Sequence, residues 1–178
     1  MNTSEIVQQL KISQQQVIIN EIEFCGQLTI EVKKIGLRNV LYYLKSTAEP
    51  GYEVLMDLTG IDYLLPEPHT QIIYVLHNPT NFERLIVKIS LKRNESLPSI
   101  TDLWEGADWY ERELYDMFGV QIEGHPDMKR ILMPDDWVGH PLQRDYALTE
   151  ESVQFKHGVK PKIPSEIIPY VQWNEKNQ

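Results

Sequence analysis

Apolar and polar residues alternate strictly along residues 84–91, where the odd-numbered positions Leu85, Val87, Ile89 and Leu91 are all apolar. A period of two is typical of a strand with one buried face. Apolar-rich runs at 17–24, 28–32, 53–59 and 71–77 predict four more strands. At 37–44 the period changes, because the apolar residues there are spaced three and four apart. That spacing predicts a helix with one buried stripe.

The order of these elements predicts the fold class. A short helix with Ile6, Val7 and Leu10 on one side precedes the first two strands, and residues 25–27 predict a hairpin turn between them. A four-residue loop at 78–81 predicts a second hairpin. Helix, two strands, helix and three strands give a two-layer α+β domain, with a mixed five-stranded sheet and two helices on one face.

The composition changes at residue 99, which divides the chain into three parts. Residues 1–98 form the predicted α+β domain. Residues 99–146 carry acids and aromatics on a helix, interrupted near Gly106 and ending at Phe118, followed by a basic loop segment packed on the same domain. Residues 147–178 contain Pro161, Pro164 and Pro169 with little apolar periodicity, so we expect an extended, proline-rich tail that binds a partner.

Charge and cysteine content exclude several functions for the chain alone. There are 17 Lys and Arg against 26 Asp and Glu, for a net charge of -9, which argues against nucleic-acid binding. The single cysteine, Cys25, cannot by itself hold an iron–sulfur cluster or a structural zinc ion. No glycine-rich phosphate-binding motif is present. We find no signal peptide and no run long enough to cross a bilayer, so membrane association is expected only through partners.

The densest cluster of charge lies between Asp102 and Asp116, which holds six acids and a single base, Arg112. Lys129, Arg130 and Arg144 could neutralise these acids from within the chain, or a partner surface could do so. A catalytic interpretation would use Glu111, Glu113 or Asp116 with His125. A plain solvated helix and a protein interface are the alternatives. Clustered aromatic residues favour the interface, since aromatics and Arg are enriched in buried interfaces.

Fixed spacings across this segment resemble a known family. They are Glu111-Arg112-Glu113, Asp116-Met117-Phe118, His125, Lys129 and Ile131-Leu132, and they continue through residues 130–134 and 137–142 to Arg144-Asp145-Tyr146. Residues 57–63 resemble the family's mid-domain strand and turn. Together they are similar to the 30 kDa subunit family of respiratory complex I, the proton-translocating NADH:quinone oxidoreductase.

The resemblance implies a non-catalytic subunit of the peripheral arm. It would support electron transfer from NADH to quinone, coupled to proton translocation, by docking on the large hydrogenase-like subunit of the 49 kDa type and on neighbouring cluster-bearing subunits. FMN, iron–sulfur clusters and quinone would lie on those partners, and this chain would carry no catalytic, cofactor or metal residues. The implied location is the cytoplasmic side of the inner membrane, as a peripheral member of a hetero-oligomer.

The implied partner interface consists of Trp109, Glu111, Arg112, Glu113, Tyr115, Asp116, His125, Lys129, Arg130, Trp137, His140, Arg144, Asp145 and Tyr146. Within it, we expect Arg112 to pair with carboxylates on both sides. Similar domains also occur in membrane-bound hydrogenases, in formate hydrogenlyase and in ferredoxin-dependent plastoquinone reductases, and no residue here separates these electron donors. A free-standing carboxylate and histidine enzyme is the alternative from a different class.

Overall fold

The structure is a computed structural model that describes residues 2–14, 16–93 and 95–147. The chain divides into two units, residues 1–144 and 145–178, and the fold below is that of the first. Its elements are α1 (Thr3–Ser13), β1 (Ile18–Phe24), β2 (Gln27–Val32), the 3-10 turn η1 (Lys34–Gly36), α2 (Leu37–Ser46), β3 (Val54–Tyr63), β4 (His69–His77), β5 (Arg84–Lys92), β6 (Ser96–Pro98), α3 (Ala107–Phe118) and β7 (Gln121–Glu123).

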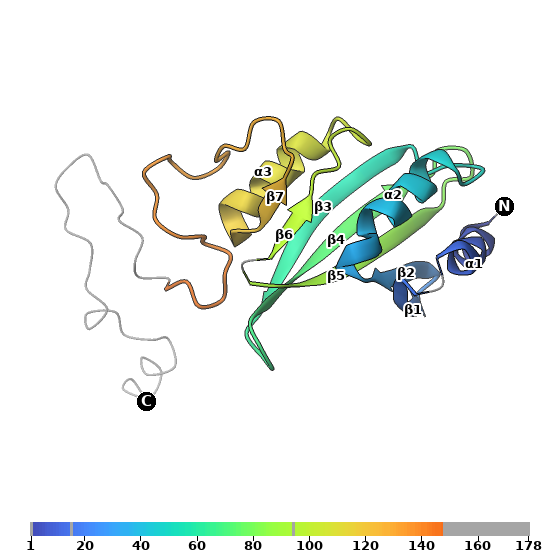
Figure 1. The fold of residues 1–178 in the computed structure, drawn as a ribbon, viewed down its shortest axis with the longest axis horizontal. Coiled ribbons are helices and arrows are strands. Elements are labelled where there is room, and N and C mark those ends of the chain that lie inside the picture. Colours follow the sequence, from blue (N-terminus) through green and yellow to red (C-terminus); the bar gives the residue numbers. More distant parts are fainter. Residues whose placement is uncertain (1, 15, 94, 148–178) are drawn as a thin grey trace, which may run out of the picture. The chain divides into compact units, whose positions relative to one another are not determined.

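Five strands form one mixed sheet in the order β1-β2-β5-β4-β3 (Figure 1). The pairs β1/β2, β3/β4 and β4/β5 are antiparallel, whereas β2 and β5 are parallel. Cys25 and Gly26 join β1 to β2 with positive φ angles of 51° and 75°. Positive φ at both central residues defines the type I′ turn, whose twist suits a tight hairpin. The mixed sheet and this hairpin confirm the fold predicted from the sequence.

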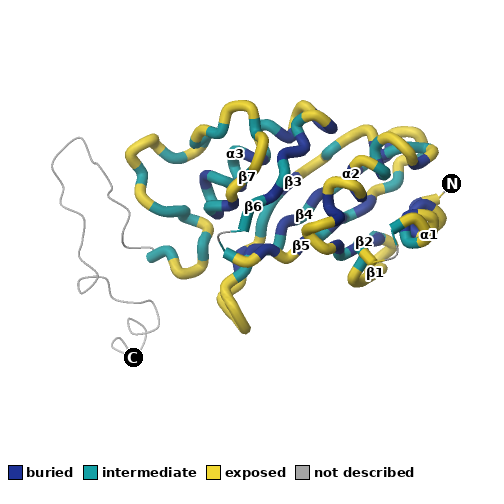
Figure 2. The backbone as a smooth tube through the Cα atoms, viewed as in Figure 1, coloured by how far each residue is buried: buried dark blue, intermediate teal, exposed yellow. Residues whose placement is uncertain are grey.

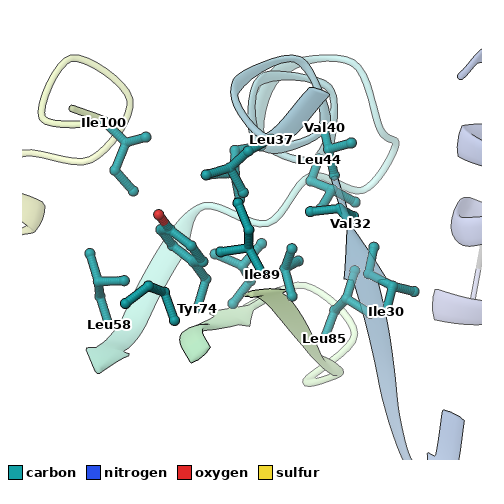
Figure 3. Packing of buried hydrophobic residues seen from close by; sticks show 14 of the residues in the cluster. Ile30, Val32, Leu37, Val40, Leu44, Leu58, Tyr74, Leu85, Ile89 and Ile100 are labelled. Carbon is teal, nitrogen blue, oxygen red and sulfur yellow. The ribbon is translucent and has the colours of Figure 1, made fainter. Parts of the chain in front are cut away.

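The hydrophobic core lies between the sheet and the helices on one of its faces. Along β4, Thr70, Ile72, Tyr74 and Leu76 are buried, and every second residue between them is only partly covered. Figure 2 shows the buried positions gathered on the strands and on the inner stripes of the helices. In Figure 3 the side chains of α2, with Val40 and Leu44 among them, point toward the central strands. The predicted stripe of α2 is therefore the stripe that is buried.

The structure differs from the sequence-based prediction between residues 96 and 123. Residues 99–106 form turns, so α3 begins at Ala107 rather than near Ser99. Two short strands that the sequence did not predict, β6 and β7, pair in parallel. Helix α3 packs on β3 at Gly60, where a Cβ atom would lie 3.2 Å from the Phe118 ring. The predicted tail at 147–178 lies outside the described residues, apart from Ala147.

Candidate functional site

Asp116 on α3 is the centre of the most densely bonded polar cluster. Its side chain has no exposed surface. Oδ1 accepts a hydrogen bond from Arg130 Nη1 at 2.6 Å. Oδ2 accepts from three successive backbone N–H groups, those of Ile131, Leu132 and Met133, at 3.1, 2.7 and 2.8 Å. Although burial alone would raise it, these four bonds hold the pKa of Asp116 below its ordinary value. The loop after His125 is thus fixed to the helix by one carboxylate.

Arg130 carries the same loop further along the chain. Its Nη2 donates to the carbonyl groups of Trp137 and Gly139, both at 3.1 Å, while Nη1 binds Asp116. A guanidinium has five N–H donors in a fixed plane, which lets one side chain hold several acceptors at once. The prediction that Arg130 neutralises the acidic helix is confirmed.

The segment 140–143 covers the carboxyl end of α3. His140 Nδ1 lies 2.9 Å from the carbonyl oxygen of Asp116, Leu142 N–H donates to Met117 at 2.9 Å, and Gln143 Nε2 donates to Phe118 at 2.7 Å. The last carbonyl groups of a helix have no partner within the helix, so an outside donor must satisfy them. Distant residues of the chain therefore supply the cap.

Arg112 does not pair as the sequence suggested. Its Nε donates to the carbonyl of Lys129 at 3.1 Å and its Nη2 to the carbonyl of Arg130 at 3.2 Å. The guanidinium also lies 5.3 Å from the centre of the Trp109 ring, within the range of a cation–π contact. The expectation of two carboxylate partners was wrong, because the backbone of the loop takes up the donors of this side chain.

Glu111 and His125 form a second buried cluster at the start of α3. Glu111 accepts from the Ile100 N–H at 2.7 Å and from Ser99 Oγ at 2.8 Å. The His125 side chain is fully buried, with Nε2 2.9 Å from Asp108 Oδ1 and 3.9 Å from Glu111 Oε2. Its Nδ1 accepts the N–H of Asp127 at 3.1 Å, so the hydrogen of the neutral ring lies on Nε2. The acid and histidine of the catalytic hypothesis do meet, but they are enclosed and hydrogen-bonded within the chain.

The family of the chain follows from this segment and the sheet before it. Residues 30–152 match the family model described as the 30 kDa subunit of respiratory-chain NADH dehydrogenase. The chain belongs to this family. The family resemblance seen in the sequence is confirmed, and this 30 kDa subunit homologue is therefore a complex I subunit and part of a hetero-oligomeric complex.

Curated relatives agree with the family assignment. The C-type subunit of NADH-quinone oxidoreductase from Roseiflexus sp. (strain RS-1) is 38% identical over 156 residues, which cover 87% of this chain and 90% of the relative. The protein of the same name from Citrifermentans bemidjiense is 45% identical over 127 residues, or 71% of this chain and 78% of the relative.

A solved structure shares the fold of this 30 kDa subunit homologue. A chain from the structure titled membrane-bound sulfane sulfur reductase, an archaeal respiratory membrane complex, superposes with a TM-score of 0.70 at 19% identity. The match covers 93% of this chain and 98% of that one, so the two have the same architecture.

Several members of the predicted partner interface are used inside the subunit. Glu111 and Asp116 are buried, with 2% and no exposed surface, and the side chain of His125 is wholly buried. A buried carboxylate whose bonds are made internally cannot contact a partner directly, so these three residues shape the surface rather than form it. Their more accessible neighbours Trp109, Lys129 and Arg144 are exposed.

The remaining predicted interface residues differ in position. Glu113, Tyr115 and Trp137 are partly covered, and the ring of Tyr115 meets that of His140 edge to face at 6.0 Å. Asp145 and Tyr146 belong to the second unit of the chain. Whether the exposed and partly covered residues contact a partner stays a prediction.

The sequence analysis missed Asp62 as a site residue. This β3 carboxylate, 3% exposed, accepts from Thr70 Oγ1 at 3.0 Å, from Arg93 Nη2 at 2.7 Å and from the Arg144 N–H at 3.0 Å. It ties residue 144 of the family segment to the sheet. An acid between apolar positions of a predicted strand was the available signal, since a buried carboxylate needs partners.

Two searches of the described residues yielded no site or span. No three His, Cys, Asp or Glu residues among them come together in a way that could hold a metal ion. Within the same part of the chain, every helix is too short or too polar to cross a membrane.

Glu111 predicts a pH dependence of stability. Burial raises its pKa above the ordinary value, with the Ile100 and Ser99 hydrogen bonds opposing the shift. The folded state therefore holds the Glu111 proton more tightly than the unfolded state does, and this contribution to stability falls as pH rises from about 4 through the raised pKa. We expect the stability advantage of the natural chain over Glu111→Gln to shrink across this pH range, measured by urea unfolding at each pH. A constant difference would contradict the assignment.

Proposed function

We propose that this protein is a non-catalytic member of the peripheral arm that docks on the large hydrogenase-like subunit of NADH-quinone oxidoreductase. In this role it supports electron transfer from NADH to quinone by holding cluster-bearing subunits in place. FMN, iron–sulfur clusters and quinone would be bound by those partners, on the cytoplasmic side of the membrane. The name shared by the relatives and the single cysteine of the chain support this role.

The observation that carries the proposal is the contrast between the two sides of the segment that wraps α3. On its inner side, Asp116, Arg130 and Arg112 fix the backbone of the segment. On its outer side, large apolar side chains remain in solvent: Trp109 is 60% exposed, Leu132 60%, Val138 85% and Leu142 47%. A fixed backbone that displays apolar side chains is suited to burial against a partner, because little ordering is needed on binding. We call these four residues the α3 docking surface.

Aspartate substitutions on the α3 docking surface test the proposal. Leu132→Asp and Val138→Asp would place a charge where an aliphatic side chain is expected to be buried. Burying a side chain of this size contributes about 1.5–3 kcal/mol, so we expect roughly a 10- to 100-fold lower yield of assembled complex for each variant. The yield is measured by native gel and by co-purification of the partner subunits.

The matched control is Ile35→Asp, at an apolar residue that is 90% exposed and lies outside the α3 docking surface. Thermal unfolding of each purified variant chain separates assembly from folding. We expect all three chains to unfold like the natural chain, since surface changes usually shift stability by less than about 0.5 kcal/mol. Normal assembly of the Leu132 and Val138 variants with unchanged quinone reductase activity would overturn the proposal.

A further inference from the structure

The two edges of the five-stranded sheet differ in how they are covered. At the β3 edge, Tyr110 Oη donates to the carbonyl of Met56 at 3.0 Å and Trp104 Nε1 donates to the carbonyl of Glu53 at 3.1 Å. At the opposite edge, β1 pairs with β2 alone. Among the described residues, no strand or helix donates to the outer backbone of β1, and the Glu21 N–H is bonded to the neighbouring Asn20 side chain. Figure 1 shows β1 at the rim of the sheet.

The hairpin turn determines which backbone groups of β1 point outward. A two-residue turn makes its flanking residues, Phe24 and Gln27, a hydrogen-bonded pair. Bonded and non-bonded pairs then alternate along an antiparallel ladder, so Ile22 bonds to β2 and the N–H and C=O groups of Glu21 and Glu23 face away from the sheet. An unpaired row of this kind is a template for another strand.

The side chains of the edge are unusually apolar for an exposed strand. Ile19 is 57% exposed, Ile22 53% and Phe24 75%. A shallow groove of about 530 Å³ runs beside the edge, lined by Lys11 of α1 together with Ile18, Ile19, Asn20, Glu21 and Glu23. The edge therefore offers main-chain hydrogen bonds and a lined groove, the two features that strand addition uses for affinity and specificity.

A row of apolar and β-branched side chains on the uncovered face of the sheet leads to this edge. Ile22 lies opposite Thr29, Thr29 opposite Ile86, and Ile86 opposite Val75. The row ends at Ile22 only because β1 is the last strand. An added strand with an apolar residue beside Ile22 would extend it, and such cross-strand pairs stabilise sheets.

Charge decides between a second copy of this chain and a different partner. On the groove side, β1 carries Glu21 and Glu23, and Lys11 pairs with Glu21 alone. If two β1 strands paired antiparallel about residue 21 or 22, Glu21 of one copy would lie opposite Glu21 or Glu23 of the other. Like charges in directly opposed positions are destabilising. A basic side chain opposite Glu23 would instead be favoured.

We propose that an extended segment of a neighbouring protein of the complex adds to β1 as a sixth strand. Its side chains alternate, with apolar residues continuing the row at Ile22 and Phe24, and Lys or Arg on the groove side opposite Glu23. This contact lies on the opposite edge of the sheet from the α3 docking surface and does not depend on it. Each of the two proposals can therefore fail without the other.

Hydrogen exchange of the backbone amides in the assembled complex and in the purified full-length chain tests the added strand. We expect the outward amide of Glu23 to exchange at least tenfold more slowly in the complex. The amide of Ile22 is the internal reference, since it bonds to β2 and should be protected in both samples. Equal exchange of the Glu23 amide in the two samples would overturn the proposal.

Photo-crosslinking identifies the occupant. A benzophenone side chain replaces Phe24 in the assembled complex, with the same replacement at Ile35 as control. We expect Phe24 to cross-link to one alternating apolar and basic segment of another protein of the complex, and Ile35 to leave that segment unlabelled. Cross-links to a second copy, to residues 148–178 of the same chain, to a helix or to no protein would each overturn the proposal.

A charge reversal separates strand addition from mere proximity. Glu23→Lys places a positive charge opposite the expected basic residue, so we expect the Phe24 cross-link yield to fall at least fivefold. Glu67→Lys is the matched control, because the Glu67 side chain is 77% exposed and lies in the β3–β4 connection. An unchanged yield in Glu23→Lys would contradict the basic character of the added strand.

Discussion

Asp116→Asn is expected to lower the free energy of unfolding by about 3–5 kcal/mol, the range found when one partner of a buried ion pair is removed. The amide keeps the shape of the carboxylate but has one oxygen in place of two. It cannot accept from Arg130 and from three backbone N–H groups together, and its own NH2 group would face donors. The guanidinium of Arg130 would also lose its buried counter-charge.

Chemical denaturation of the purified chain at pH 7 measures this loss. Asp127→Asn is the control, because Asp127 lies in the same segment and binds Lys129 at 2.8 Å but is exposed. We expect no measurable change for the control, since exposed ion pairs contribute little. Because the pKa of Asp116 is depressed, its contribution is present above the ordinary pKa near 4 and is lost as pH falls through the folded value. The difference between natural chain and variant should therefore vanish in acid.

The sheet was predictable because its strands carry their own patterns. The alternation at 84–91 and the helical spacing at 37–44 report which side chains face the core, and both were right. The strands β6 and β7 have three residues each, which is too short for a period to show. Helix α3 begins eight residues late because the Glu111 carboxylate holds Ser99 and the Ile100 N–H, and the chain turns to reach it.

Residue types predicted the polar site, but the sequence could not predict its pairing. Spacing of four along a helix suggested that Arg112 meets Asp108 and Asp116. In the structure, a loop from beyond residue 124 reaches Arg112 and Asp116 with its backbone, and backbone groups leave no trace in a pattern of side chains. Asp62 was missed for a related reason, since its partners come from 8, 31 and 82 residues away.

The acidic helix thus serves the fold before it serves a partner. Of the six acids between residues 102 and 116, Glu111 and Asp116 are buried and hold neighbouring backbone in place, and Asp102 pairs with Arg38 at 2.6 Å. The negative charge that seemed available to a partner is largely used within the chain. What remains for docking is mostly apolar, which agrees with the depletion of charged residues at the centres of interfaces.

Gly119 should be far less tolerant of a methyl group than Gly124, although both residues have the same backbone conformation. Their φ angles are 76° and 80°, a region that costs any other residue about 1–2 kcal/mol. A Cβ atom at Gly124 meets nothing within 4 Å. At Gly119 it would lie 2.6 Å from Cδ2 and 2.9 Å from Nε2 of His140, the ring that bonds to the Asp116 carbonyl.

We therefore expect Gly124→Ala to lower the free energy of unfolding by about 1–2 kcal/mol and Gly119→Ala to lower it by about 2–5 kcal/mol, since overpacking adds roughly 1–3 kcal/mol. The excess at Gly119 should shrink in a His140→Ala background, where the ring is absent. Urea unfolding of the four chains gives this coupling directly. Equal losses at both glycines would mean that His140 yields freely, and that the segment 140–143 does not fix the end of α3.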